Sequence, residues 1–152
     1  MTQTQSATAR LPRRIGSILR TFLLASIACG DSTPHDPCSP VDPVLTRSSF
    51  VAVIEPMAGM RASSPLQVRG CSRTFESNVV WELRARDGSI LASGHTSGGG
   101  SAGAAAFSFA VSFTVSTPEL GHLEVFEPDV SDGEGLPGGR SIIPIVLLPS
   151  IE

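Results

Sequence analysis

The sequence has no lysine and no tyrosine, and its single tryptophan is Trp81. All 11 basic residues are therefore arginines, a bias from which no function follows. With only 5% aromatic residues, the chain has few side chains on which a sugar ring can stack, and this argues against a carbohydrate-binding module. It also has no long helical periodicity, whereas 15 Gly and 12 Pro favour a protein of strands and turns.

Positive charge is scarce after the first 28 residues, which hold four Arg and no acidic residue. From Cys29 onward, 7 Arg stand against 14 Asp and Glu, so this part carries a net charge of −7. Phosphate backbones are bound by basic faces, so we expect no nucleic-acid partner. The acidity is accounted for by solubility.

Residues 1–28 have the pattern of an export signal. An arginine-rich segment is followed by the short apolar run TFLLASIA at 21–28, and small residues precede Cys29. Even counted from Ile15, the apolar run has 14 residues and is interrupted by Arg20. It is too short to span a bilayer comfortably, so we predict a signal peptide rather than a membrane anchor.

Cys29 is the candidate lipidation site. Ser26-Ile27-Ala28-Cys29 resembles a bacterial lipobox, although Ser26 stands where Leu is usual, and it also satisfies the small-x-small rule of an ordinary signal peptidase. Lipidation of Cys29 would leave Cys38 and Cys71 free to pair, whereas an unmodified Cys29 leaves an odd thiol in an exported chain. We therefore expect a membrane anchor formed by an N-terminal lipid, with ordinary cleavage as the alternative.

Residues 29–49 are predicted to form a tether. Four prolines recur at every third position, which favours an extended, stiff conformation. His35 and Asp36 lie beside Cys38, but no second ligand pair at zinc-like spacing accompanies them, so no metal site is predicted.

Residues 50–152 are predicted to form an all-β domain. Within 78–86, Val79, Trp81 and Leu83 alternate with mostly polar residues, and Asp87-Gly88 is typical of a hairpin turn. Pro144 cannot donate a ladder hydrogen bond, which predicts an edge strand or a bulge. The expected strands lie at 50–55, 66–71, 78–86, 89–95, 106–115, 121–127 and 141–148.

About seven short antiparallel strands with a buried tryptophan on the third predict a single immunoglobulin-like β-sandwich. The cysteine pair that pins the two sheets of antibody domains is missing, because the strand at 121–127 has no Cys. Packing must then stabilise the domain. The predicted core comprises Leu66, Val68, Trp81, Leu83, Phe107, Phe109, Phe113, Leu123 and Val125.

The alternation at 66–71 directs Val68 and Gly70 inward and Cys71 outward, at the end of its strand. From there Cys71 could reach Cys38. A disulfide between them would close a loop of about 33 residues and contribute roughly 3–4 kcal/mol. Two free thiols are the alternative.

Several of these segments together resemble the immunoglobulin-like domain of bacterial spore germination proteins over residues 50–148. The resemblance implies an envelope module found on exported or membrane-anchored proteins, with no catalytic residues to carry over, and Cys71 replaces an expected small residue. The matching segments are Ile54-Glu55-Pro56, Ser64-Pro65-Leu66-x-Val68-x-Gly70, Phe75-Glu76, Val80-x-x-Leu83, Asp87-Gly88, the Phe-rich strand at 107–115, residues 121–127, Asp132-Gly133 and residues 143–147.

No catalytic, cofactor or metal residues are predicted. His35, His95 and His122 fall in the tether and at strand ends, without a nucleophile placed beside them. An acidic, glycine-rich loop at 129–140 carries Asp129, Asp132 and Glu134, which could ligate calcium but do not have EF-hand spacing and are read as a plain turn.

The sequence therefore predicts a non-catalytic binding or scaffolding module of the cell envelope, with an envelope protein or peptidoglycan as partner. An accessory domain that positions a cell-wall hydrolase, or one that binds cell-wall carbohydrate, is the alternative. Two surfaces are candidates for recognition. One is the pair of loops at 97–103 and 129–140, and the other is the edge of the strand containing Pro144.

Overall fold

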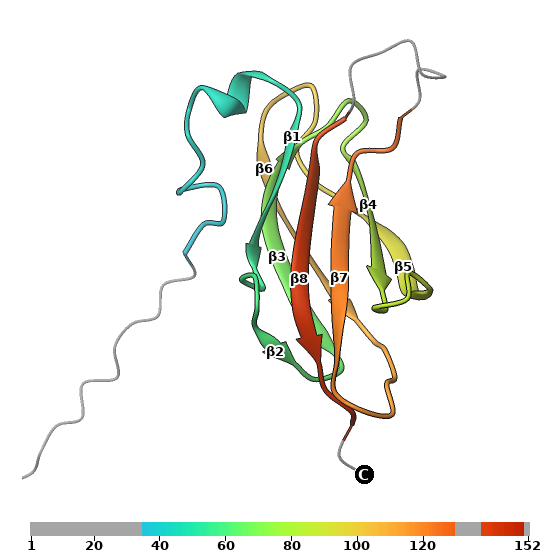
Figure 1. Ribbon diagram of the computed structural model, residues 1–152. Coiled ribbons are helices and arrows are strands. Elements are labelled where there is room, and N and C mark those ends of the chain that lie inside the picture. The colour runs from blue at the N-terminus through green and yellow to red at the C-terminus, as the bar shows by residue number, and fades with distance from the viewer. Residues whose placement is uncertain (1–34, 130–137, 151–152) are drawn as a thin grey trace, which may run out of the picture. The chain divides into compact units, whose positions relative to one another are not determined.

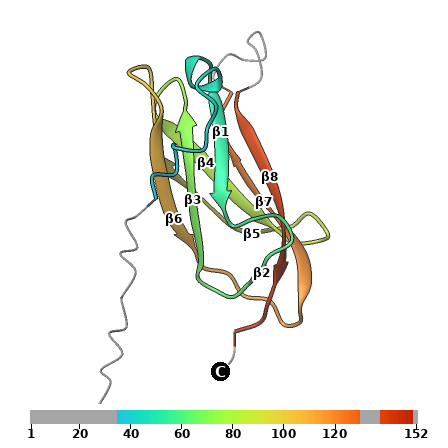
Figure 2. The same cartoon turned by 90° about the vertical axis from the view of Figure 1, so that its left-hand side faces the viewer.

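The computed structural model describes residues 35–129 and 138–150. The predicted signal peptide at 1–28 and the predicted lipidation site Cys29 lie outside the described residues. The described part is a sandwich of two β-sheets, seen from two sides in Figures 1 and 2. Within it, no helix is long and apolar enough to cross a membrane.

The two sheets contain three and five strands, in the orders β1-β3-β6 and β2-β8-β7-β4-β5. All pairings are antiparallel except the short parallel pair of β2 with β8. This is an immunoglobulin-like β-sandwich, and the fold class is as predicted. The elements are the 3-10 helix η1 (Leu45–Arg47) and the strands β1 (Phe50–Glu55), β2 (Arg61–Ala62), β3 (Leu66–Arg73), β4 (Asn78–Arg84), β5 (Ile90–Ser97), β6 (Ala105–Val111), β7 (Glu119–Phe126) and β8 (Arg140–Leu147).

Period-two alternation places one face of each strand in the core. On β4, Val79, Trp81 and Leu83 are buried, while the residues between them are only partly buried. The β4–β5 hairpin turns at Asp87-Gly88 as expected, where Gly88 has a positive φ of 87°. Its N–H donates to the carbonyl of Ala85, which closes the turn.

The core lies between the two sheets and is organised around Trp81. The indole stacks on Phe109, with ring centroids 5.0 Å apart and planes 8° from parallel. Phe109 is only partly buried, whereas the other predicted core residues are buried. Prediction from sequence missed Ile145 and Leu147 of β8, which are fully buried. Each such aliphatic side chain contributes about 1.5–3 kcal/mol on burial.

Two predicted strand properties are corrected. The strand predicted at 106–115 ends at Val111, although Phe113 and Val115 beyond it remain buried. The strand that contains Pro144 is not an edge strand, because β2 pairs with β8 on the side opposite β7. The carbonyl of Pro144 also accepts a hydrogen bond from the N–H of Gly59. The predicted recognition edge at Pro144 is therefore covered.

Candidate functional site

Residues 35–49, which we call the strap, lie against β3 rather than forming a free stalk. Cys38 and Cys71 form a disulfide, with Cα atoms 4.9 Å apart. Arg69 donates from Nη2 to the carbonyl of His35 at 3.3 Å, and Arg73 donates from Nη1 to the carbonyl of Thr46 at 2.9 Å. The predicted tether at 29–49 is thus corrected from residue 35 onward, since the disulfide, Arg69 and Arg73 bind this segment to the domain and the hydroxyl of Ser49 donates to the carboxylate of Glu127.

Turns replace the extended proline conformation expected in the strap. The carboxylate of Asp36 accepts the N–H of Cys38, and the carboxylate of Asp42 accepts the N–H of Val44. These side-chain acceptors satisfy the backbone N–H groups of Cys38 and Val44, and they fold the backbone into turns. The disulfide to Cys71 places Cys38 over β3. The strap then leads into η1 at one end of the sandwich (Figure 1).

Cys71 points to the outer face of its sheet, as the alternation predicts, but it is neither exposed nor at the strand end. Its exposed fraction is 0%, because the strap covers it, and β3 continues to Arg73. The sequence allows either a bond to Cys38 or a free thiol, and the structure has the bond. The closed loop spans 33 residues.

Four segments meet at the strap end of the sandwich and form a groove, which we call the loop-end groove. Its volume is about 280 Å³. The segments are the end of the strap, the β3–β4 loop, the β5–β6 loop and the end of β7. The lining residues are Arg47, Ser48, Ser49, Arg73, Thr74, Phe75, Ser101 and Glu127.

Glu127 joins three of these segments. Its carboxylate accepts hydrogen bonds from the backbone N–H of Phe75 and from the hydroxyl of Ser49, and its own N–H donates to the carbonyl of Gly139 at 2.9 Å. Charge-assisted bonds of this kind are among the stronger polar contacts in proteins. Glu127 therefore fixes the shape of the loop-end groove. Both of its carboxylate oxygens already accept hydrogen bonds, from Ser49 and from Phe75.

Phe75 is the chemically unusual residue of the groove, because 74% of its surface is exposed. Val44 and Leu45 of the strap are also exposed, at 74% and 51%. Arg47 is exposed on the groove wall, whereas Arg73 is engaged with Thr46. An exposed aromatic ring beside an arginine is typical of protein-binding surfaces. Of the predicted 97–103 loop, Ser101 lines the loop-end groove, whereas residues 130–137 of the other predicted loop lie outside the described residues.

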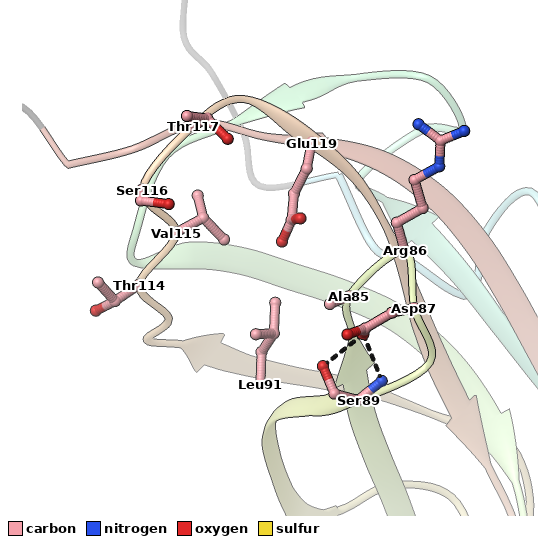
Figure 3. A pocket seen from close by; sticks show the side chains of 10 residues that line it. All are labelled: Ala85, Arg86, Asp87, Ser89, Leu91, Thr114, Val115, Ser116, Thr117 and Glu119. Atoms are coloured by element: carbon pink, nitrogen blue, oxygen red, sulfur yellow. Dashed lines mark hydrogen bonds between the residues drawn. The ribbon is translucent and has the colours of Figure 1, made fainter.

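A second hollow, of about 670 Å³, lies at the opposite end of the sandwich (Figure 3). The β4–β5 turn and the β6–β7 connection form its walls, and Leu91 and Val115 supply apolar surface. Glu119 points into this hollow, whereas Arg86 extends away from it. Four hydroxyl side chains complete the lining: Ser89, Thr114, Ser116 and Thr117.

Asp87 at the rim of this hollow is held by its own turn. Its carboxylate accepts from the hydroxyl of Ser89 at 2.6 Å and from the backbone N–H of Ser89 at 2.9 Å. The side-chain bond, and after it the backbone bond, lowers the pKa of Asp87 below its ordinary value. The carboxylate is therefore a turn-stabilising group and not a proton donor at neutral pH.

The structure does not assemble the three histidines. His95 lies opposite Val80 on β5, His122 lies opposite Arg84 on β7, and the carbonyl of His35 accepts from Arg69 in the strap. Among residues 35–129 and 138–150, no group of three or more His, Cys, Asp or Glu could hold a metal ion. Asp132 and Glu134 of the acidic loop lie outside these ranges.

The sequence model of the immunoglobulin-like domain of bacterial spore germination matches residues 50–134. The chain belongs to this family. The match covers most of the sandwich, from β1 through β7. Comparison with curated proteins and with solved structures returned no match. The chain is therefore a germination-type immunoglobulin-like module, and domains of this family are generally non-catalytic.

Sequence reasoning missed the residues that shape the groove. From the sequence, Glu127 is only the last residue of a predicted strand, and Phe75 is only part of a family motif. Their roles arise from contacts between residues 49, 75 and 127, which no local pattern reports. The one available signal was the position of a phenylalanine in a turn between two polar residues, Thr74 and Glu76.

Proposed function

We propose that the protein is a non-catalytic binding module of the bacterial cell envelope, exported and anchored in a membrane through a lipid on Cys29. The observation that carries the proposal is the disulfide between Cys38 and Cys71. Disulfides persist in oxidising compartments outside the cytoplasm, which supports export. The bond also uses two of the chain's three cysteines, which leaves Cys29 available for lipidation.

In this proposal, the disulfide limits the length of chain between the anchor at Cys29 and the module. Eight residues lie between Cys29 and Cys38, and nine extended residue steps span at most about 30 Å. A tether that stayed free up to Ser49 would span roughly 70 Å. The strap therefore supports a module that works close to the membrane surface, on partners that are themselves at or near the membrane.

The partner in this proposal is an envelope protein that buries Phe75 in the loop-end groove. An exposed phenylalanine provides apolar area that a partner can cover, and Arg47 provides a charged hydrogen-bond donor beside it. The groove walls are fixed before binding by Glu127 and by the disulfide-bound strap. Such pre-organisation lowers the ordering cost of association.

Capture from the native envelope tests the binding role. The membrane-extracted protein is cross-linked, purified and compared with Phe75→Ser and with Met57→Ser, a matched change at a methionine that is 68% exposed in the β1–β2 loop. The proposal expects a defined set of envelope proteins with the unchanged protein and with Met57→Ser, and loss of that set with Phe75→Ser. Equal capture by all three would refute the role of the groove.

Cell-wall carbohydrate remains a second candidate because the hydroxyl-lined hollow of Figure 3 offers several hydrogen-bonding groups. Its lining has no aromatic residue, so binding would rest on hydrogen bonds without ring stacking. Co-sedimentation with purified peptidoglycan separates the two candidates. Retention that is lost in the double variant Ser116→Ala, Thr117→Val and kept in Phe75→Ser would favour the wall ligand. An associated hydrolase in the cross-linked set would instead favour the accessory role.

A further inference from the structure

One long stretch of the chain is free of formal charge. Residues 88–118 contain no Asp, Glu, Lys or Arg, although such residues make up 16% of the sequence. The stretch includes β5, the glycine-rich β5–β6 loop and β6. In the sandwich, this charge-free stretch forms one continuous flank.

This flank contains the open edge of each sheet. β5 is the outermost strand of the five-stranded sheet, β6 is the outermost strand of the three-stranded sheet, and the two contact each other across the sandwich. On the opposite flank the outer strand of the five-stranded sheet, β2, has only two residues, and the hydroxyl of Ser141 on β8 donates to the carbonyl of Val51 on the outer strand β1 at 2.8 Å. β5 lies on the side away from β2 in Figure 1, and β6 lies on the side away from β8 in Figure 2.

Exposed strand edges pair readily with other strands, and proteins that stay monomeric protect them with charges, prolines, bulges or covering segments. β5 has neither a charged residue nor a proline, and none of its residues is fully buried. The irregularity in its pairing with β4 lies at the Ile90 end, which leaves Ala92–Ser97 in regular register. β5 thus presents a regular edge with none of these protections along six residues.

The backbone groups that face outward from β5 can be assigned. The N–H of Gly98 donates to the carbonyl of Ser77, just before β4. The backbone N–H and C=O of Gly98 therefore point toward the β4 side and not toward the open edge. Along an antiparallel strand, the backbone N–H and C=O of successive residues point alternately to one neighbour and to the other. The N–H and C=O of Ser97 therefore point to the open side. The same alternation directs the N–H and C=O of Ser93 and His95 outward.

We propose that two copies of this chain pair through their β5 edges, antiparallel and about a two-fold axis, so that the two five-stranded sheets become one. A symmetric contact places a surface against itself, so any charged residue in it meets a like charge. The chain beyond residue 28 carries a net charge of −7, which opposes self-association through its charged faces. The charge-free flank is the face on which two acidic copies approach without that repulsion.

Sedimentation of the full chain carrying Cys29→Ser tests this pairing, because the substitution removes lipid and any bond between two Cys29 thiols. The expected result is a concentration-dependent dimer. His95→Lys puts a positive charge on the open edge, and Ser93→Pro removes an outward N–H while keeping the ladder to β4. Both variants should weaken the dimer by about tenfold or more. Gln67→Lys, an exposed position on the central strand β3, is the matched control and should leave it unchanged.

Amide hydrogen exchange locates the contact independently of mutation. The amides of Ser93, His95 and Ser97 should exchange more slowly as protein concentration rises. A chain that remains monomeric at high concentration, or a dimer that neither edge variant weakens, would overturn the proposal. If Ser93→Pro fails to fold, His95→Lys and the exchange pattern still test whether two copies pair through β5. Protection of these amides only in the presence of envelope extract would assign the edge to a different protein and likewise overturn self-pairing.

Discussion

Gly94 of β5 lies directly against the indole of Trp81 of β4, its register partner. A Cβ at Gly94 would stand 2.5 Å from Cζ2 of Trp81, which is closer than a carbon–carbon contact allows. The indole uses this space to lie parallel to Phe109 of the opposite sheet. The missing side chain at position 94 is therefore a requirement of the core, and Trp81 joins the two sheets.

Gly94→Ala should reduce the free energy of unfolding by about 1–3 kcal/mol, because the added methyl forces the indole or β5 to move. Ser93→Ala, one residue away and on the exposed face, should change stability by less than about 0.5 kcal/mol. Chemical denaturation followed by Trp81 fluorescence measures both. Equal stability of the two variants would contradict the packing described for Trp81.

Removal of the strap disulfide by Cys38→Ser should lower the free energy of unfolding by roughly 3–4 kcal/mol, because the bond closes a loop of 33 residues. The strap should also become accessible to protease, since the hydrogen bonds that remain, from Arg69 and Arg73 to the strap and from Ser49 to Glu127, include none near Cys38 other than the one from Arg69 to His35. Denaturation with and without reductant, combined with limited proteolysis, measures these effects. Unchanged stability together with a protease-resistant strap would show that the bond is not what holds it.

Glu127→Ala should destabilise the fold by about 1–3 kcal/mol and speed exchange of the Phe75 amide, because the variant removes the acceptor of two hydrogen bonds. Glu76→Ala is a suitable control, since Glu76 is exposed in the same β3–β4 loop. Its effect on the Phe75 amide should be small. If both variants behave alike, Glu127 does not organise the loop-end groove.

Asp87 should titrate below its ordinary pKa of 3.8, because the hydroxyl and the N–H of Ser89 favour the ionised form. Because the pKa of Asp87 is lower in the folded state, its ionised carboxylate stabilises the fold fully above about pH 3.8. This stabilisation is lost as the pH falls through the folded-state pKa. NMR titration of the Asp87 carboxyl carbon measures this midpoint. Ser89→Ala should raise it toward the ordinary value, and an unchanged midpoint would contradict the assignment to Ser89.

The sandwich could be predicted from the sequence because apolar and polar residues alternate locally within its strands. Trp81 is recognisable as buried from residues 79–83 alone. β2 could not be predicted in the same way, since two residues carry no periodicity and Arg61 and Ala62 pair with residues more than eighty positions away. The prediction of an edge strand at Pro144 is wrong for the same reason, because β2 pairs with β8. A proline shows that a backbone donor is missing on one side of the strand, but it does not show which segment pairs with the strand.

The strap illustrates a further limit of sequence reasoning. Alternation correctly directs Cys71 away from the core, but burial on that side depends on where residues 35–49 fold, and their prolines indicate only stiffness. The loop-end groove is likewise formed by residues remote in the sequence. Serine, phenylalanine and glutamate at 49, 75 and 127 become one network only after both sheets have formed.

Intact mass spectrometry of the mature protein from its native membrane tests the central claim most directly. The account predicts a product that starts at Cys29, carries acyl chains, and gains two mass units on reduction as the Cys38–Cys71 bond opens. Cys29→Ser should give a product without acyl chains that no longer partitions with the membrane. An unmodified product in the native membrane fraction, or one without the mass change on reduction, would contradict the account of an exported, lipid-anchored module.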